Sequence, residues 1–126
     1  MSDAPLVAVV NGDNGNLTLL QALLTERGYR VMLHKDGTAA HSTLKRSRPD
    51  LVLLDVPIDD PAGSWTLLDL LTLDPDTLGI PVLVCCNEPK MVAHKVDILR
   101  QAGNDILEKP FSKDILIGRV EALLHT

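Results

Sequence analysis

The chain alternates five short apolar runs with longer amphipathic stretches, and this alternation constrains its fold more than any other feature. Each run has the length of a strand, and each stretch carries apolar residues at helical spacing. The predicted strands are residues 6–10, 30–33, 51–55, 81–86 and 105–108, and the predicted helices are residues 16–28, 37–49, 64–79, 89–103 and 112–126. Strands that alternate with such helices pair in parallel, with right-handed crossovers and helices on both faces of the sheet. We therefore predict a doubly wound α/β domain with three layers around a five-stranded parallel sheet.

Residues typical of helix ends support these boundaries. Gly28 and Gly103 follow helical patterns, as C-cap glycines do, and Pro49 closes the second predicted helix. Asn16 and Ser112 precede helical patterns and are predicted N-caps.

Length, composition and charge indicate one small globular domain. With 126 residues, 45% of them hydrophobic and 23% charged, the chain is long enough to bury one core. We expect residues 1–126 to form a single domain, with a core over about residues 5–125 and no effector domain. The net charge of −5 is spread over both halves, which argues against a surface for nucleic acid or for an anionic membrane.

The start of the chain and its cysteines indicate the compartment. The first ten residues, MSDAPLVAVV, contain no basic leader, and no apolar run approaches the roughly 18 residues of a membrane span. We therefore expect a cytoplasmic protein. Cys85 and Cys86 are neighbours on a predicted strand, where successive side chains point to opposite faces and an ordinary disulfide is strained. We predict that both are reduced thiols.

Polar residues stand where the predicted strands end. In sheets of this kind the functional crevice lies beyond the carboxyl ends of the strands. The residues at these ends are Asn11, Gly12 and Asp13 for the first strand, Asp55 for the third, Cys86 and Asn87 for the fourth, and Lys109 for the fifth. An acid and a lysine from separate strands then share one rim of the sheet. A carboxylate beside an ammonium group stays ionised at neutral pH, which suits an acid that acts as a nucleophile.

Four segments, RPDLVLLD, TLGIPVLV, AGNDILEKPF and the closing helix, resemble the receiver domain of bacterial response regulators. The resemblance runs from Leu6 to Leu124. It implies a flavodoxin-like fold with strand order 2-1-3-4-5, in which a histidine kinase passes a phosphoryl group to an aspartate. By position, Asp55 resembles this phospho-acceptor, and Lys109 resembles the lysine that contacts the phosphoryl group.

Other positions depart from the receiver pattern. The acidic pair that supplies Mg²⁺ ligands in the family falls on Asn11 and Gly12, so Asp13 is the acid that is left there. The hydroxyl position after the fourth strand falls on Cys86, and the aromatic switch position on the fifth strand falls on Ile106. One extra residue lies in the loop after Asp55.

The departures predict weak metal binding. Mg²⁺ usually takes one or two carboxylates plus waters, and it assists phosphoryl transfer by bridging the oxygens. Asp55 is one potential ligand, and Asp13 reaches the site only if its loop shifts. Asp59 and Asp60 either compensate from the loop after the third strand or are simply solvated. We expect Mg²⁺ binding to be weak or absent.

The same departures predict a blunted switch. A thiol is a poor hydrogen-bond donor, so Cys86 would couple weakly to a phosphoryl group, and Ile106 lacks the hydroxyl with which a tyrosine reports its rotamer. Structural interpretations stand beside the functional ones: Cys86 as a small apolar filler, and Lys109 as a simple ion-pair partner of Asp55. Trp65 is predicted to pack under the third helix. The four histidines lack metal-ligand spacing and a partner acid, and are interpreted as surface residues: His34, His41, His94 and His125.

Two functional hypotheses follow. The first is a stand-alone receiver domain of a two-component phosphorelay, phosphorylated on Asp55 by a sensor histidine kinase or a phosphotransfer protein. The second is a phosphorylation-independent interaction module held in one state by the Asp55–Lys109 pair. An enzyme is not expected, because no flavin-binding phosphate loop and no nucleophile with a base is visible.

The resemblance implies an output surface made of the fourth helix, the fifth strand and the fifth helix. Residues 90–103 carry more apolar side chains than one buried stripe needs, which is compatible with a homodimer or a partner contact and also with an ordinary helix.

Overall fold

The computed structural model describes residues 4–10, 14–35, 37–56, 62–86, 99–109 and 111–124. Strands and helices alternate through these ranges. In chain order they are β1 (Leu6–Val10), α1 (Asn14–Glu26), β2 (Arg30–His34), α2 (Gly37–Ser47), β3 (Leu51–Asp55), α3 (Ala62–Leu73), β4 (Val82–Cys86), β5 (Asp105–Glu108) and α5 (Lys113–Leu124). Residues 99–101 are helical as well and residues 102 and 103 form a turn, while residues 89–98 of the helix predicted over 89–103 lie outside the described residues.

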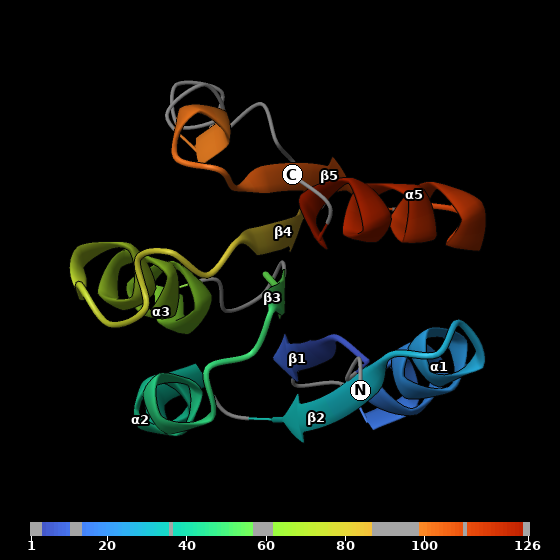
Figure 1. The fold of residues 1–126 in the computed structure, drawn as a ribbon, viewed down its shortest axis with the longest axis horizontal. Coiled ribbons are helices and arrows are strands. Elements are labelled where there is room, and N and C mark those ends of the chain that lie inside the picture. The colour runs from blue at the N-terminus through green and yellow to red at the C-terminus, as the bar shows by residue number, and fades with distance from the viewer. Residues whose placement is uncertain are drawn as a thin grey trace.

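The strands form one parallel sheet of five strands in the order β2-β1-β3-β4-β5, as predicted. Figure 1 shows α1 and α5 on one face of the sheet and α2 and α3 on the other. The layers and the strand order confirm the doubly wound, flavodoxin-like fold. Because all strands are parallel, the carboxyl ends of β3, β4 and β5 lie at the same edge of the sheet.

The core has two halves, one on each face of the sheet. Side chains of a strand alternate between faces, so Val7 and Val9 pack on the α1/α5 side while Ala8 and Val10 pack on the α2/α3 side. The central strands are buried on both faces, which explains why β3 and β4 consist of continuous apolar runs instead of alternating ones. The helices cover the sheet with buried side chains that include Leu24, Leu116, Ile117 and Val120 on one face and Leu44, Leu67, Leu68 and Leu71 on the other.

The predicted helix ends are mostly confirmed. Gly28 and Gly103 both adopt φ +88°, the left-handed conformation that glycine adopts without steric cost after a helix. The Ser112 hydroxyl accepts a hydrogen bond from Ile115 N–H at 3.2 Å, as an N-cap does. The prediction for Asn16 was wrong, because α1 begins two residues earlier, at Asn14.

The third helix ends earlier than predicted, because α3 ends at Leu73 and residues 75–79 form turns. Pro75 disfavours a helical conformation of the preceding residue, Asp74. The Asp74 carboxylate then accepts the N–H of Asp76 at 3.0 Å, and its carbonyl accepts the N–H of Leu78 at 2.8 Å. These local bonds replace those of another helical turn.

Candidate functional site

The carboxyl-end rim of the sheet brings Asp55 and Lys109 together. Asp55 is the last residue of β3, and Lys109 directly follows β5. The Lys109 ammonium donates a hydrogen bond to Oδ1 of Asp55 and lies 3.5 Å from the carbonyl oxygen of Val56. The side chains of Asp55 and Lys109 are 14% and 21% exposed, so the ion pair is largely shielded yet reachable from solvent.

Backbone bonds at the strand ends fix the spacing of this pair. Lys109 N–H donates to the carbonyl oxygen of Cys86 at 2.8 Å, and Val56 N–H donates to that of Cys85 at 2.9 Å. These bonds extend the β3–β4 and β4–β5 ladders by one residue each and therefore hold both charged residues beside β4. Because the sheet holds the backbone of both residues, little backbone freedom is lost when their side chains form the ion pair.

Ser64 makes a contact with Asp55 that was not predicted from the sequence. Its hydroxyl, near the start of α3, donates to the main-chain carbonyl oxygen of Asp55 at 2.8 Å. The bond connects the first turn of α3 to the end of β3. A serine near a helix start is a common local signal, but its partner nine residues earlier becomes visible only in the fold.

Cys86 and Ile106, the two predicted switch positions, are buried. Both belong to the core cluster on the α2/α3 face, with exposures of 5% and 6%. The environment of Cys86 is the one that its interpretation as a small apolar filler requires. Ile106 likewise packs in the core and has no group that reports to solvent.

The second thiol, Cys85, lies directly behind the rim. Its Cα is the register partner of Asp55 across the β3–β4 ladder. Burial, and secondarily the Asp55 charge, raises the pKa of the Cys85 thiol to about 12, while Lys109 acts in the opposite direction. Cys85 is therefore protonated at neutral pH. Both cysteines are thiols and not a disulfide, as the sequence predicts.

Several predicted site residues lie outside the described residues. They are Asn11, Gly12, Asp13, Asp59, Asp60 and Asn87. Within the part of the chain that the structure describes, no three His, Cys, Asp or Glu side chains form a group that fits a metal ion. Asp55 contributes one carboxylate, and one of its oxygens already accepts the Lys109 bond. These residues alone do not make a Mg²⁺ site.

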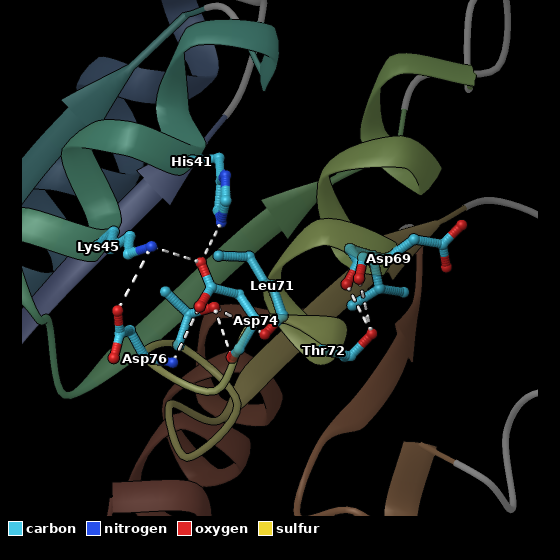
Figure 2. Close-up of polar contacts among 9 residues, drawn as sticks. His41, Lys45, Asp69, Leu71, Thr72, Asp74 and Asp76 are labelled. Carbon is cyan, nitrogen blue, oxygen red and sulfur yellow. Dashed lines mark hydrogen bonds and ion pairs between the residues drawn. The ribbon is translucent and has the colours of Figure 1, made fainter.

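The interpretation of His41 as a surface residue without a partner acid was wrong. Its Nε2 lies 3.0 Å from Oδ2 of Asp74, an oxygen that also lies 3.2 Å from the Lys45 ammonium (Figure 2). Lys45 reaches Asp76 too, at 3.3 Å. We call His41, Lys45, Asp74 and Asp76 the α2/α3 ion cluster. Asp74 is 33 residues from His41, so no local pattern reveals the contact.

The remaining predictions concern the other three histidines and Trp65. His34 is also not a free surface group: its Nε2 is buried with no hydrogen-bond partner among the described residues, and burial lowers the pKa of its ring. His94 and His125 lie outside the described residues. Trp65 packs against the core cluster under α3, as predicted.

Comparison with known proteins gives one consistent result. The model of the response regulator receiver domain family matches residues 7–121. The transcriptional regulatory protein ZraR of Klebsiella oxytoca is 36% identical over 95% of this chain, and the chain spans only 26% of the length of that relative.

Solved structures with a similar fold include response regulators and receiver domains. A putative response regulator from Chloroflexus aurantiacus matches with a TM-score of 0.80 and 25% identity, over 98% of this chain and 99% of its own. The receiver domain of the sensor histidine kinase PA1611 from Pseudomonas aeruginosa, solved with a magnesium ion in its active site cleft, has the same fold with a TM-score of 0.78 and 24% identity, over 98% of this chain and 99% of its own.

Among the described residues, no helix combines the length and the apolar character needed to cross a membrane.

Proposed function

This chain belongs to the response regulator receiver domain family, and from that premise we propose that it accepts a phosphoryl group on Asp55 from a sensor histidine kinase or a phosphotransfer protein. The observation that carries the proposal is the contact of the Lys109 ammonium with the Asp55 carboxylate at the carboxyl-end rim. Both residues stand at the positions that the family pattern assigns to the acceptor and to the phosphoryl-contacting lysine.

The chemistry requires a nucleophile and a cation at one point. A carboxylate oxygen of Asp55 attacks the phosphorus of a phosphohistidine, the phosphorus–nitrogen bond breaks, and the imidazole leaves with the electron pair and takes up a proton. An acyl phosphate on Asp55 results. Lys109 moves from the carboxylate oxygen to a phosphoryl oxygen within the reach of its flexible stem and offsets the charge that the transfer brings to the rim.

We propose that Mg²⁺ supports this step only weakly. The related fold of PA1611 was solved with magnesium in its cleft. In this chain the positions of the family's acidic pair hold Asn11 and Gly12, and the described residues contribute the single carboxylate of Asp55. Fewer anionic ligands leave more of the cost of dehydrating Mg²⁺ uncompensated.

We propose that output passes through the surface of β5, α5 and the helical turn at residues 99–101. Asp105 connects the parts of this surface. Its carboxylate accepts a hydrogen bond from Arg100 Nε at 3.0 Å and another from a guanidinium nitrogen of Arg119 at 2.9 Å. Burial raises the pKa of Asp105, but the bond from Ile106 N–H and the two arginines outweigh it, and the net pKa lies below the ordinary value. A kinase, an output protein or a second copy would dock on a surface held together by this charged bridge.

The ion pair also favours a second function, a phosphorylation-independent interaction module. Lys109 already offsets the Asp55 charge, and the two switch positions are filled by the buried side chains of Cys86 and Ile106. A domain of this kind acts through its surface, in one fixed state, and not as an enzyme.

One experiment separates the two functions. The protein is incubated with a small phosphodonor, with and without Mg²⁺, and its intact mass is measured. We expect a gain of one phosphoryl group in the wild type, a gain of the same size in the control Asp69→Asn on the exposed face of α3, and none in Asp55→Asn. No gain in the wild type at saturating donor and metal contradicts phosphorylation and favours the interaction module.

A further inference from the structure

The main-chain carbonyl of Asp55 has a hydroxyl partner from outside the sheet. Ser64 is the third residue of α3, and its hydroxyl donates to this carbonyl oxygen at 2.8 Å, nine residues back along the chain. Ser47 in α2 shows the commoner pattern of a helical serine, because its hydroxyl bonds to the carbonyl oxygen of Thr43, four residues earlier, at 2.6 Å. Ser64 instead connects its helix to the strand end that carries the proposed phospho-acceptor.

The Ser64 bond holds the side of the Asp55–Val56 peptide that faces away from β4. The N–H of Val56 donates to the carbonyl oxygen of Cys85 at 2.9 Å, so it points toward β4. A trans peptide is planar, with its N–H and C=O on opposite sides, so the Asp55 carbonyl points toward β1. The register of β1 with β3 ends one residue earlier, at Leu54. Ser64 therefore satisfies this carbonyl just beyond the point where the described pairing with β1 ends.

This peptide determines where the Asp55 carboxylate lies. Asp55 is held by its register with Cys85 across the β3–β4 ladder and by the two bonds of the peptide that follows it. The Lys109 ammonium contacts the carboxylate and lies 3.5 Å from the carbonyl oxygen of Val56. A rotation of the Asp55–Val56 peptide would therefore shift these two oxygens relative to the ammonium. Ser64 opposes that rotation.

The Ser64 bond is independent of the ion pair. It joins a hydroxyl to a main-chain carbonyl, and neither group is charged, so it can persist when Lys109 moves from the carboxylate to a phosphoryl oxygen. A serine hydroxyl has one hydrogen to donate, and here the Asp55 carbonyl accepts it. Ser64 is therefore suited to hold Asp55 in place and not to donate to an incoming phosphoryl group.

We propose that Ser64 is a positioning residue for phosphoryl transfer to Asp55. Its hydroxyl keeps the Asp55–Val56 peptide, and with it the nucleophilic carboxylate, in one orientation while Lys109 changes partner. Alignment of a nucleophile with the atom that it attacks strongly affects the rate of a transfer step. The inference rests on the proposed phosphorylation of Asp55, and it adds a residue that is not among the site positions implied by the receiver resemblance.

The test follows the rate of acyl-phosphate formation on the full chain. The phosphodonor is phosphoramidate, because its phosphorus–nitrogen bond is of the kind that breaks in phosphohistidine. Intact mass is measured against time, in excess Mg²⁺, for the wild type, Ser64→Ala, Ser64→Thr and Ser47→Ala. Ser64→Thr keeps a hydroxyl at the contact. Ser47→Ala is the matched control, because it removes a hydroxyl that bonds to a carbonyl of α2, a helix that contributes no residue to the ion pair.

We expect Ser64→Ala to form the acyl phosphate about tenfold more slowly than the wild type, Ser64→Thr to stay within about threefold of it and Ser47→Ala within about twofold. Circular dichroism confirms that the variants are folded. A rate in Ser64→Ala equal to that of the wild type would overturn the proposal and leave the phosphorylation of Asp55 standing. A loss in Ser64→Thr as large as in Ser64→Ala would also overturn it, because the hydroxyl would then not be the group that matters.

A second measurement separates the contact from the reaction. The chemical shift of the Asp55 carbonyl carbon, measured by NMR without phosphodonor, should move in Ser64→Ala and stay close to the wild-type value in Ser64→Thr and Ser47→Ala, because the carbonyl loses its hydrogen bond only in the first variant. An unchanged shift in Ser64→Ala would contradict the contact itself. A wild type that gains no phosphoryl group would instead refute the proposed function, and the role of Ser64 in the transfer with it.

Discussion

The rim and the α2/α3 ion cluster both join an acid to a cation across two elements, but they satisfy the acid differently. At the rim, Lys109 is the side chain that the described structure places on the Asp55 carboxylate. In the cluster, Asp74 accepts bonds from Asp76 N–H, Lys45 and His41. An acid with one mobile partner can exchange that partner for a ligand, whereas an acid with three is held in place. The number of partners, more than the presence of an ion pair, distinguishes a candidate reactive carboxylate from a structural one.

The largest expected effect is on phosphorylation. Asp74→Asn should keep the full gain of one phosphoryl group, because Asp74 takes no part in the rim, while Asp55→Asn should lose it entirely. Intact mass after reaction with a small phosphodonor measures both. A gain that survives in Asp55→Asn would break the comparison, because another residue would then be the acceptor.

The second effect concerns the thiol behind the rim. With a pKa of about 12 against an ordinary 9.0, the Cys85 thiol should react with iodoacetamide at about pH 8 roughly a thousandfold more slowly in the folded protein than in urea. The rate is followed by mass in a Cys86→Ala background. Rapid alkylation of the folded protein would show that the rim opens to solvent more than the structure indicates.

The third effect is on stability. Lys109→Met leaves the partly buried Asp55 charge without its partner and should lower the free energy of unfolding by about 2 kcal/mol, less than for a fully buried pair. Lys45→Met should cost less, because Lys45 is 45% exposed and Asp74 keeps its other partners. Urea denaturation measures both changes.

A double-mutant cycle provides the control for this prediction. Adding Asp55→Asn to Lys109→Met removes the unpaired charge, so the double variant should recover at least about half of the lost stability. Strictly additive losses would mean that the two residues do not interact as the structure shows.

The smallest effect is the acid response of the cluster. The bond from Asp76 N–H lowers the pKa of Asp74, burial opposes it, and Lys45 and His41 lower it further, so the net pKa in the folded state is below that in the unfolded state. The unfolded state then binds more protons as the pH falls. The stabilisation by Asp74 is complete above about pH 4 and disappears as the pH drops through the folded-state pKa.

Asp74→Asn tests this response. Its stability deficit relative to the wild type should be largest near neutral pH and should shrink below about pH 4. Urea unfolding at several pH values measures the deficit. A deficit that does not change with pH would mean that the Asp74 contacts stabilise through geometry and not through charge.

Much of the fold follows from local patterns. Buried parallel strands require continuous apolar runs, so β3 and β4 could be predicted almost to the residue. The end of α3 could not, because Leu78 continues the helical spacing of Leu71, while Pro75 and the side-chain bond of Asp74 end the helix. The start of α1, two residues before the predicted cap Asn16, shows the same weakness at an element boundary.

The sequence by itself determined the class of the fold, the family and the two residues proposed for phosphoryl transfer, because strand periodicity and the residues at strand ends are local properties. The pairing of Lys109 with Asp55 was also expected from the sequence, whereas tertiary structure alone revealed the contacts of His41 with Asp74 and of Ser64 with the Asp55 carbonyl. The Lys109–Asp55 and His41–Asp74 pairs join residues 54 and 33 positions apart, and Ser64 lies nine positions after Asp55. Such contacts depend on how helices and strands are stacked, and that arrangement is set by burial of the whole core.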